Sequence, residues 1–123
     1  MLTAERAEAL AEEWIAAWNA HDLDAILQHY ADDVVFTSPF VARLLGAGQD
    51  TVRGKAALRD YFARALAAYP DLRFGLRAVL LGVDSLTLYY ASVGGRLAAE
   101  VMLLDADGRV ERVLAHYTAP GQA

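Results

Sequence analysis

The strongest constraint on the fold is a change of periodicity at Pro70. Before it, apolar residues recur three and four positions apart, as in amphipathic helices; after it, four strand-like runs alternate with turns that contain Gly or Asp. Helices followed by a meander of strands are typical of the α+β class, in which the helices pack on one face of a sheet. No tract resembles a linker, so we expect a single domain over 1–123.

Three helices are expected before the change. The first spans 3–19 and places Trp14 and Trp18 on one face, and the second follows an Asp cap and spans 22–31. The third spans 54–70 and carries an apolar stripe. The second helix would turn its apolar side, including Tyr30, toward the core and leave His29 in solvent.

The run "VVFTSPF", residues 34–40, predicts a first strand because it is rich in β-branched and aromatic residues and ends near a proline. Phe36 and Ser38 share one face of this strand, and we expect that face to point inward. An irregular loop is expected up to the third helix. His21 lies at the junction of the first two helices, where capping or solvation is a more common use than metal binding.

Composition narrows the function classes. The chain is 56% hydrophobic with a mean hydropathy of +0.22, which is more apolar surface than a small interior absorbs, so we expect an internal pocket, a self-association surface or both. The net charge of −5 is spread along the sequence without a basic run, which argues against nucleic-acid binding.

The absence of cysteine excludes disulfides, thiolate chemistry and cysteine-type zinc sites. We expect no metal and no cofactor. No stretch approaches the ~18 apolar residues of a membrane span, and the N-terminal segment is charged and helical, so a cytoplasmic protein without membrane association is expected.

The turn "DADG", residues 105–108, joins the last two strands. A loop of two or four residues would pair Glu100 with Val113 and place both on one face with Ala115 and Tyr117. A three-residue loop with a glycine bulge would bring His116 onto that face instead.

The segments "WIAAWNAHDLDAILQHYADDVVFTSP" and "VRGKAALRDYFARAL" resemble the nuclear transport factor 2-like superfamily, in particular its ketosteroid isomerase and SnoaL-like polyketide cyclase branches. The similarity covers nearly the whole chain. It implies a cone-shaped fold, with three N-terminal helices on a curved antiparallel or mixed sheet around a pocket. It also favours the register that puts Val113, Ala115 and Tyr117 in the pocket. This fold hosts several enzyme classes and non-catalytic proteins.

The resemblance locates the ketosteroid isomerase machinery residue by residue. Its aspartate base corresponds to Ser38, and its two oxyanion donors correspond to Trp14 and Glu100. The base is therefore missing, and we expect no appreciable isomerisation of a β,γ-unsaturated ketosteroid. Glu100, flanked by apolar residues, is expected to be buried near Tyr117 or Trp14 without an arginine partner, and burial would raise the pKa of its carboxyl.

The leading hypothesis is a cyclase- or isomerase-like enzyme that binds a small, apolar, cyclic carbonyl compound. The alternative is a non-catalytic ligand-binding or dimerisation module; an epoxide hydrolase ranks last because no arginine is expected in the pocket.

The outer sheet face is expected to form a homodimer, with His116 at or near the interface. The candidate catalytic residues are Glu100, Tyr117 and Ser38, and the candidate pocket residues are Trp14, Trp18, Tyr30, Phe36, Tyr61, Phe62, Tyr90, Met102, Val113 and Ala115.

Overall fold

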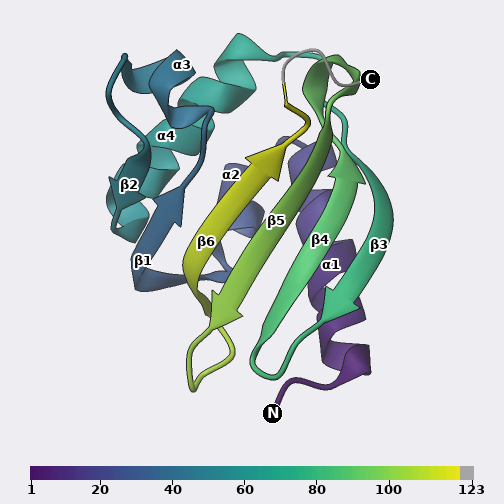
Figure 1. The fold of residues 1–123 in the computed structure, drawn as a ribbon. Helices are drawn as coiled ribbons and strands as arrows, with labels where there is room; N and C mark the ends of the chain where they lie inside the picture. The colour runs from purple at the N-terminus through teal and green to yellow at the C-terminus, as the bar shows by residue number, and fades with distance from the viewer. Residues whose placement is uncertain (120–123) are drawn as a thin grey trace.

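The computed structural model describes residues 1–119 and has helices on one side of a six-stranded sheet (Figure 1). The α+β class and the cone-like, curved-sheet architecture are confirmed, but there are four α-helices in this part of the chain where three were predicted. The helices are α1 Ala4–Asn19, α2 Leu23–Leu27, α3 Val41–Leu45 and α4 Lys55–Ala68. The strands are β1 Tyr30–Thr37, β2 Thr51–Arg53, β3 Gly75–Leu81, β4 Ser85–Ala91, β5 Leu97–Leu104 and β6 Val110–Tyr117.

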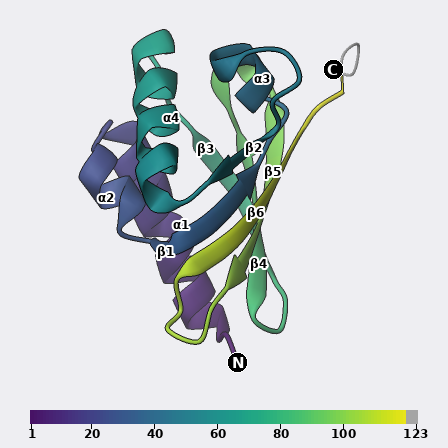
Figure 2. The ribbon, with the colours of Figure 1, turned by 90° about the vertical axis from the view of Figure 1, so that its left-hand side faces the viewer.

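The strand order is β2-β1-β6-β5-β4-β3, and the only parallel pair among these strands is β1 with β6. The sheet is therefore mixed. Helices α1, α2 and α4 cover one face, and no helix of the described residues covers the other (Figure 2). The apolar sides of α1 and α4 face the inner side of the sheet, and the core lies between these two layers.

The chain between α1 and β1 differs from the expectation. Asp22 caps α2 through the Ala25 N–H at 3.1 Å, as predicted, but α2 ends at Leu27 instead of continuing to residue 31. The carbonyl of His29 accepts a hydrogen bond from the Val110 N–H at 2.8 Å. Because this bond joins His29 to the first residue of β6, the chain is extended at His29 and not helical. Tyr30 consequently begins β1, and His29 is half-buried, not solvent-facing as predicted.

The expected loop after β1 contains the extra helix, α3. Its first residue, Val41, is fully buried, and the Leu44 N–H bonds back to the Phe40 carbonyl at 3.3 Å. Burial of an apolar side chain at this point favours a compact helical turn over the irregular loop that the nearby glycines indicated.

Residues at the junction of α1 and α2 hydrogen-bond to residues 72–74, the segment directly before β3. The side-chain amide of Asn19 donates to the Phe74 carbonyl at 2.9 Å and accepts from the Phe74 N–H at 2.7 Å. His21 adopts a left-handed φ of 56° and places its Nε2 2.9 Å from the Leu72 carbonyl oxygen. These bonds fix residues 72–74 against α1, so His21 has a structural contact where capping or solvation was expected.

The β5–β6 hairpin has the predicted faces but a different pairing. Gly108 supplies the positive φ of 79° in the turn. The first pair is Leu104 with Val110, whereas the predicted register pairs Leu104 with Arg109. A further shift between Leu103 and Leu104 then pairs Glu100 with Ala115, where Val113 had been predicted. Two one-residue offsets preserve the alternation, so Glu100 remains on the inner face with Val113 and His116 stays exposed on the other.

Candidate functional site

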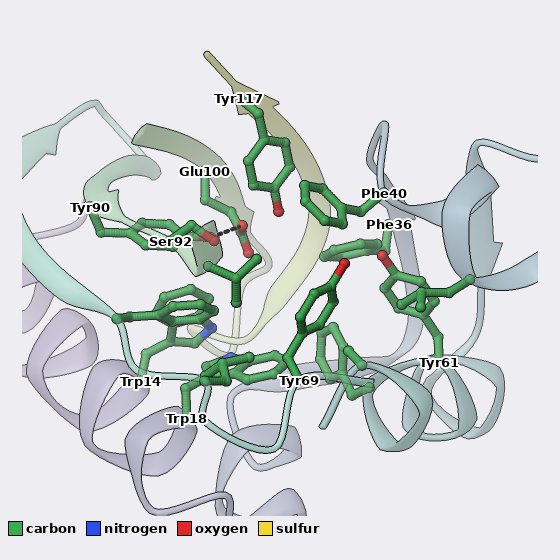
Figure 3. Close-up of a pocket in the computed structure, with 16 residues that line it drawn as sticks. Trp14, Trp18, Phe36, Phe40, Tyr61, Tyr69, Tyr90, Ser92, Glu100 and Tyr117 are labelled. Atoms are coloured by element: carbon green, nitrogen blue, oxygen red, sulfur yellow. Dashed lines mark hydrogen bonds between the residues drawn. The ribbon is translucent and has the colours of Figure 1, made fainter. Parts of the chain in front are cut away.

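A cavity of about 50 Å³ lies between α1, α4 and the inner face of the sheet (Figure 3). This is room for a few water molecules or a small ring and is well below the ~300–1,000 Å³ of a drug-sized pocket. Aromatic side chains make most of its wall. The lining residues are Trp14, Trp18, Phe36, Phe40, Leu44, Tyr61, Phe62, Ala65, Tyr69, Leu72, Phe74, Tyr90, Ser92, Val93, Glu100 and Tyr117.

The structure brings most of the candidate residues to this cavity. Trp14 and Trp18 come from α1, while Tyr90, Glu100 and Tyr117 come from the sheet, on the opposite side (Figure 3). Phe36, Tyr61 and Phe62 complete this group. The remaining pocket candidates do not line the cavity and lie in the surrounding core: Tyr30, Met102, Val113 and Ala115.

Glu100 is the one ionisable carboxyl in the wall of this cavity, and it is 3% exposed. The Tyr90 hydroxyl donates a hydrogen bond of 2.9 Å to its Oε1, and Tyr117 and Trp14, one of which was expected within its reach, line the same cavity. Burial raises the pKa of the Glu100 carboxyl to about 7, although the bond from Tyr90 acts in the opposite direction. No arginine lies among the lining residues. The carboxyl can therefore give or take a proton near neutral pH.

Neutral phenols surround this carboxyl. Burial, followed by the nearby Glu100 carboxylate, raises the pKa of both Tyr61 and Tyr117 above the ordinary value for tyrosine. The hydroxyl of Tyr117 points into the cavity (Figure 3). Because these phenols keep their protons at physiological pH, they can donate hydrogen bonds to an oxygen atom of a ligand.

The Trp14 indole does not serve as the oxyanion donor that its position suggested. Its N–H donates to the Tyr30 hydroxyl at 2.9 Å, within the core. The Trp18 indole N–H is also buried and has no hydrogen-bond partner in the described part of the chain. Trp18 packs edge-on against Phe62, with ring centroids 4.8 Å apart.

Ser38 is buried beside the cavity but is absent from its wall. Its Oγ accepts a hydrogen bond from the Phe40 N–H at 3.2 Å and so caps the turn into α3. The strand position that the ketosteroid isomerase resemblance assigns to the base is thus occupied by a turn-stabilising hydroxyl.

Half of the wall was not anticipated from the sequence. Residues 72–74 open the first strand-like run after Pro70. Leu72 and Phe74 alternate there with Arg73, and this alternation indicates a buried side. Phe40 was placed at the end of the first strand, after the proline, and was not assigned to the pocket. The unanticipated lining residues are Phe40, Leu44, Ala65, Tyr69, Leu72, Phe74, Ser92 and Val93.

A second, shallower hollow of about 290 Å³ lies outside the cavity. The two share Tyr69, Leu72, Ser92 and Val93 as a common wall. Within residues 1–119, no three side chains of the metal-ligating types come together, and no helix has the length and apolarity needed to cross a membrane.

The family model described as "SnoaL-like domain" matches residues 11–121, which is most of the chain. The chain belongs to the SnoaL-like family. A SnoaL-like protein of unknown function from Burkholderia thailandensis E264 is 44% identical in sequence, and its crystal structure superimposes with a TM-score of 0.90 over 97% of this chain and 100% of that one.

Two more distant structures share the fold. SalBIII, described as an epoxide hydrolase/cyclase-like enzyme in pyran ring formation in the polyether salinomycin, is 19% identical with a TM-score of 0.75, covering 97% of this chain and 95% of that one. A proposed isomerase of the SnoaL-like family from Agrobacterium tumefaciens str. C58 is 16% identical with a TM-score of 0.73, covering 92% and 97%. At these identities the similarity establishes the fold, and the chemistry of this SnoaL-like chain must come from its own cavity.

Proposed function

We propose that this chain binds a small, largely apolar carbonyl or ether compound in the cavity and acts on it by proton transfer at Glu100, as an isomerase- or cyclase-type enzyme. One observation carries the proposal: a buried carboxyl, bonded to the Tyr90 hydroxyl and free of any cationic partner in the cavity wall, faces an aromatic space. A structural ion pair would lower the pKa of such a group, whereas here burial raises it to about 7.

The chemistry needs no further reagent. In an isomerisation, the ionised Glu100 takes a proton from the carbon next to a carbonyl, and the neutral acid returns it to another carbon as the double bond moves. In a ring closure, a hydroxyl of the ligand attacks the carbon of an epoxide in the same molecule and the epoxide C–O bond breaks. The neutral Glu100 acid donates its proton to the departing oxygen, and the resulting carboxylate takes the proton of the attacking hydroxyl. The Tyr117 phenol can donate a hydrogen bond to the oxygen on which negative charge develops. Related folds carry such chemistry, since SalBIII is described as acting in pyran ring formation.

The test uses 3-cyclohexen-1-one, a one-ring β,γ-unsaturated ketone whose conjugation is followed by ultraviolet absorbance. The wild type should accelerate conjugation over buffer, and Glu100→Gln should lose about 10²-fold or more of that acceleration. Glu111→Gln, a carboxyl on the exposed side of β6, is the matched control and should retain it. Equal rates for wild type and Glu100→Gln would refute the catalytic role.

The second candidate is a non-catalytic binding module. Ser38 favours it, because the strand position of the usual base carries a buried hydroxyl that already caps a turn. The two candidates differ in the fate of the ligand: a binding module releases 3-cyclohexen-1-one unchanged, with the same isomer composition as a buffer control.

We also propose that the chain forms a homodimer through the outer face of the sheet. Leu80 is 57% exposed and Leu103 is 38% exposed on this face, beside half-buried Tyr89, Val101 and Leu114. Water penalises such a surface by ~25 cal/mol per Å², and a two-fold axis would let the same apolar patch cover its own copy. His116 lies exposed on this side and would be close to the contact.

A further inference from the structure

Two arginine side chains lie over one ring at the edge of the cavity. The guanidinium carbon of Arg43, in α3, is 4.8 Å from the centroid of Phe40, and that of Arg96, directly before β5, is 5.7 Å from the same centroid. Phe40 itself lines the cavity and packs on Tyr117 with ring centroids 4.5 Å apart. Two positive charges therefore lie against a residue of the cavity wall, without lining the cavity themselves.

The two guanidinium groups have hydrogen-bonding capacity to spare. Neither Arg43 nor Arg96 forms an ion pair or a side-chain hydrogen bond within residues 1–119. A guanidinium that contacts a ring through its face keeps its five N–H donors at its edge, where they match the two oxygens of a carboxylate. The aromatic contact places each group beside Phe40 without using these donors, although Arg43 is exposed.

The surrounding charges make this pair unusual. The chain carries a net charge of −5, yet two positive side chains contact the same ring. The charge at this place is therefore opposite in sign to that of the whole chain. Asp50, the nearest acidic residue along the chain after α3, accepts its hydrogen bond from the Thr51 hydroxyl at 2.8 Å and is not paired with Arg43.

We propose that Arg43 and Arg96 form a carboxylate-binding subsite at the lip of the cavity, so that the ligand is a small acid with an apolar body. Its body would lie against Phe40 and Tyr117, and its reacting oxygen or carbon would reach Glu100. The size of the cavity supports this arrangement, because about 50 Å³ holds a small ring but leaves a charged end outside. This inference rests on the proposed function for the cavity itself and adds the ligand's charge.

The test compares two probes of equal shape, cyclohexanecarboxylate and its neutral analogue cyclohexanecarboxamide, at pH 7.5. Binding is followed by the indole N–H signals of the two tryptophans, both of which line the cavity. We expect the wild type to bind the carboxylate about tenfold more tightly than the amide, with a preference that shrinks as salt is added.

The double variant Arg43→Gln/Arg96→Gln should lose this preference while its affinity for the amide stays within about twofold. Arg77→Gln, an exposed arginine on β3, removes one positive charge elsewhere and is the matched control that should keep the preference. Each single variant should lose part of the preference, so the comparison survives even if the double variant does not fold.

The outcomes separate the subsite from the cavity. Equal, salt-independent binding of the two probes, or an unchanged preference in the double variant, would overturn the arginine subsite and leave binding in the cavity intact. If neither probe shifts either indole signal up to its solubility limit, the subsite fails. The proposed function fails as well only if 3-cyclohexen-1-one also leaves both signals unshifted and its conjugation is not accelerated.

Discussion

Tyr90 and Glu100 are diagonal neighbours on the inner face of the sheet, and the phenol of Tyr90 donates a 2.9 Å hydrogen bond to the Glu100 carboxylate. The pairs Leu88 with Glu100 and Tyr90 with Ala98 create this diagonal between β4 and β5. The bond joins two groups that are both buried, so its strength depends on whether the carboxyl is ionised.

The stability of the fold should depend on pH through Glu100. Its pKa is about 7 in the folded chain against an ordinary value of 4.5, so the folded state binds more protons between these values. Stability therefore falls as pH rises from about 4.5 to 7 and levels off above it, by roughly 3 kcal/mol at 1.36 kcal/mol per pKa unit. Urea unfolding of wild type and Glu100→Gln across this range measures the difference; a constant difference would contradict the raised pKa.

Removing the Tyr90 hydroxyl should raise the pKa of Glu100 further, because the hydrogen bond stabilises the ionised form. In Tyr90→Phe the pH profile of the stability difference and of any catalysed reaction should both move to higher pH. Tyr89→Phe is the control, since Tyr89 is on the outer face of the same strand. Carboxyl carbon shifts in NMR titrations report the pKa directly, and a lower value in Tyr90→Phe would reverse this assignment.

Ser38→Asp should give a small gain in the conjugation of 3-cyclohexen-1-one and a clear loss of stability. The new carboxylate would be buried where Ser38 is 1% exposed, and the loss of hydration would penalise its ionised form even if it accepts the Phe40 N–H in place of the hydroxyl. We expect a cost of about 2 kcal/mol. A β,γ-unsaturated ketosteroid should remain unreactive with the wild type, because four fused rings exceed a cavity of about 50 Å³. Robust turnover of the steroid would contradict this size limit.

Leu72→Ala should connect the cavity with the outer hollow, because Leu72 is part of their shared wall. The two-ring ketone 1-decalone should then gain affinity relative to cyclohexanone. Leu58→Ala is the matched control, because Leu58 is fully buried and lines neither space. Both variants should lose ~2–5 kcal/mol of folding stability, but Leu58→Ala should not change the preference for ligand size. An identical preference in both variants would show that Leu72 does not limit ligand size.

Disruption of the outer face should decide the association state. Val101→Lys places a charge at the centre of β5 on the uncovered side, and sedimentation velocity should show a wild-type dimer become a monomer. A wild-type monomer at micromolar concentration would refute the homodimer.

The sequence indicated the class of fold and the inward face of each long strand, because these follow from periodicity alone. Glu100 was identified for this reason: alternation puts it on the apolar side, and that holds for any even shift of the hairpin. The pairing itself depends on bulges that local sequence does not specify. The end of α2 was missed because a single long-range bond, from Val110 to the His29 carbonyl, decides it.

The cavity wall was harder to anticipate for the same physical reason. Phe40 and Leu72 belong to connecting segments whose path is set by contacts with distant residues, such as the bond between His21 and the Leu72 carbonyl. The polar partner of Glu100 was also missed, since a diagonal neighbour across β4 and β5 requires the register of both strands.

The parallel pairing of β1 with β6 has a consequence for synthesis of the chain. Phe36, made early, is paired in the sheet with Val113, which is among the last strand residues to be made. A ribosome-bound chain that has completed β5 already carries the aromatic residues of α1 and α4 but has no strand to hold β1 beside β5. The cavity therefore cannot close co-translationally until β6 has emerged. Until then the apolar side chains of its wall stay exposed, and chaperones bind surfaces of this kind.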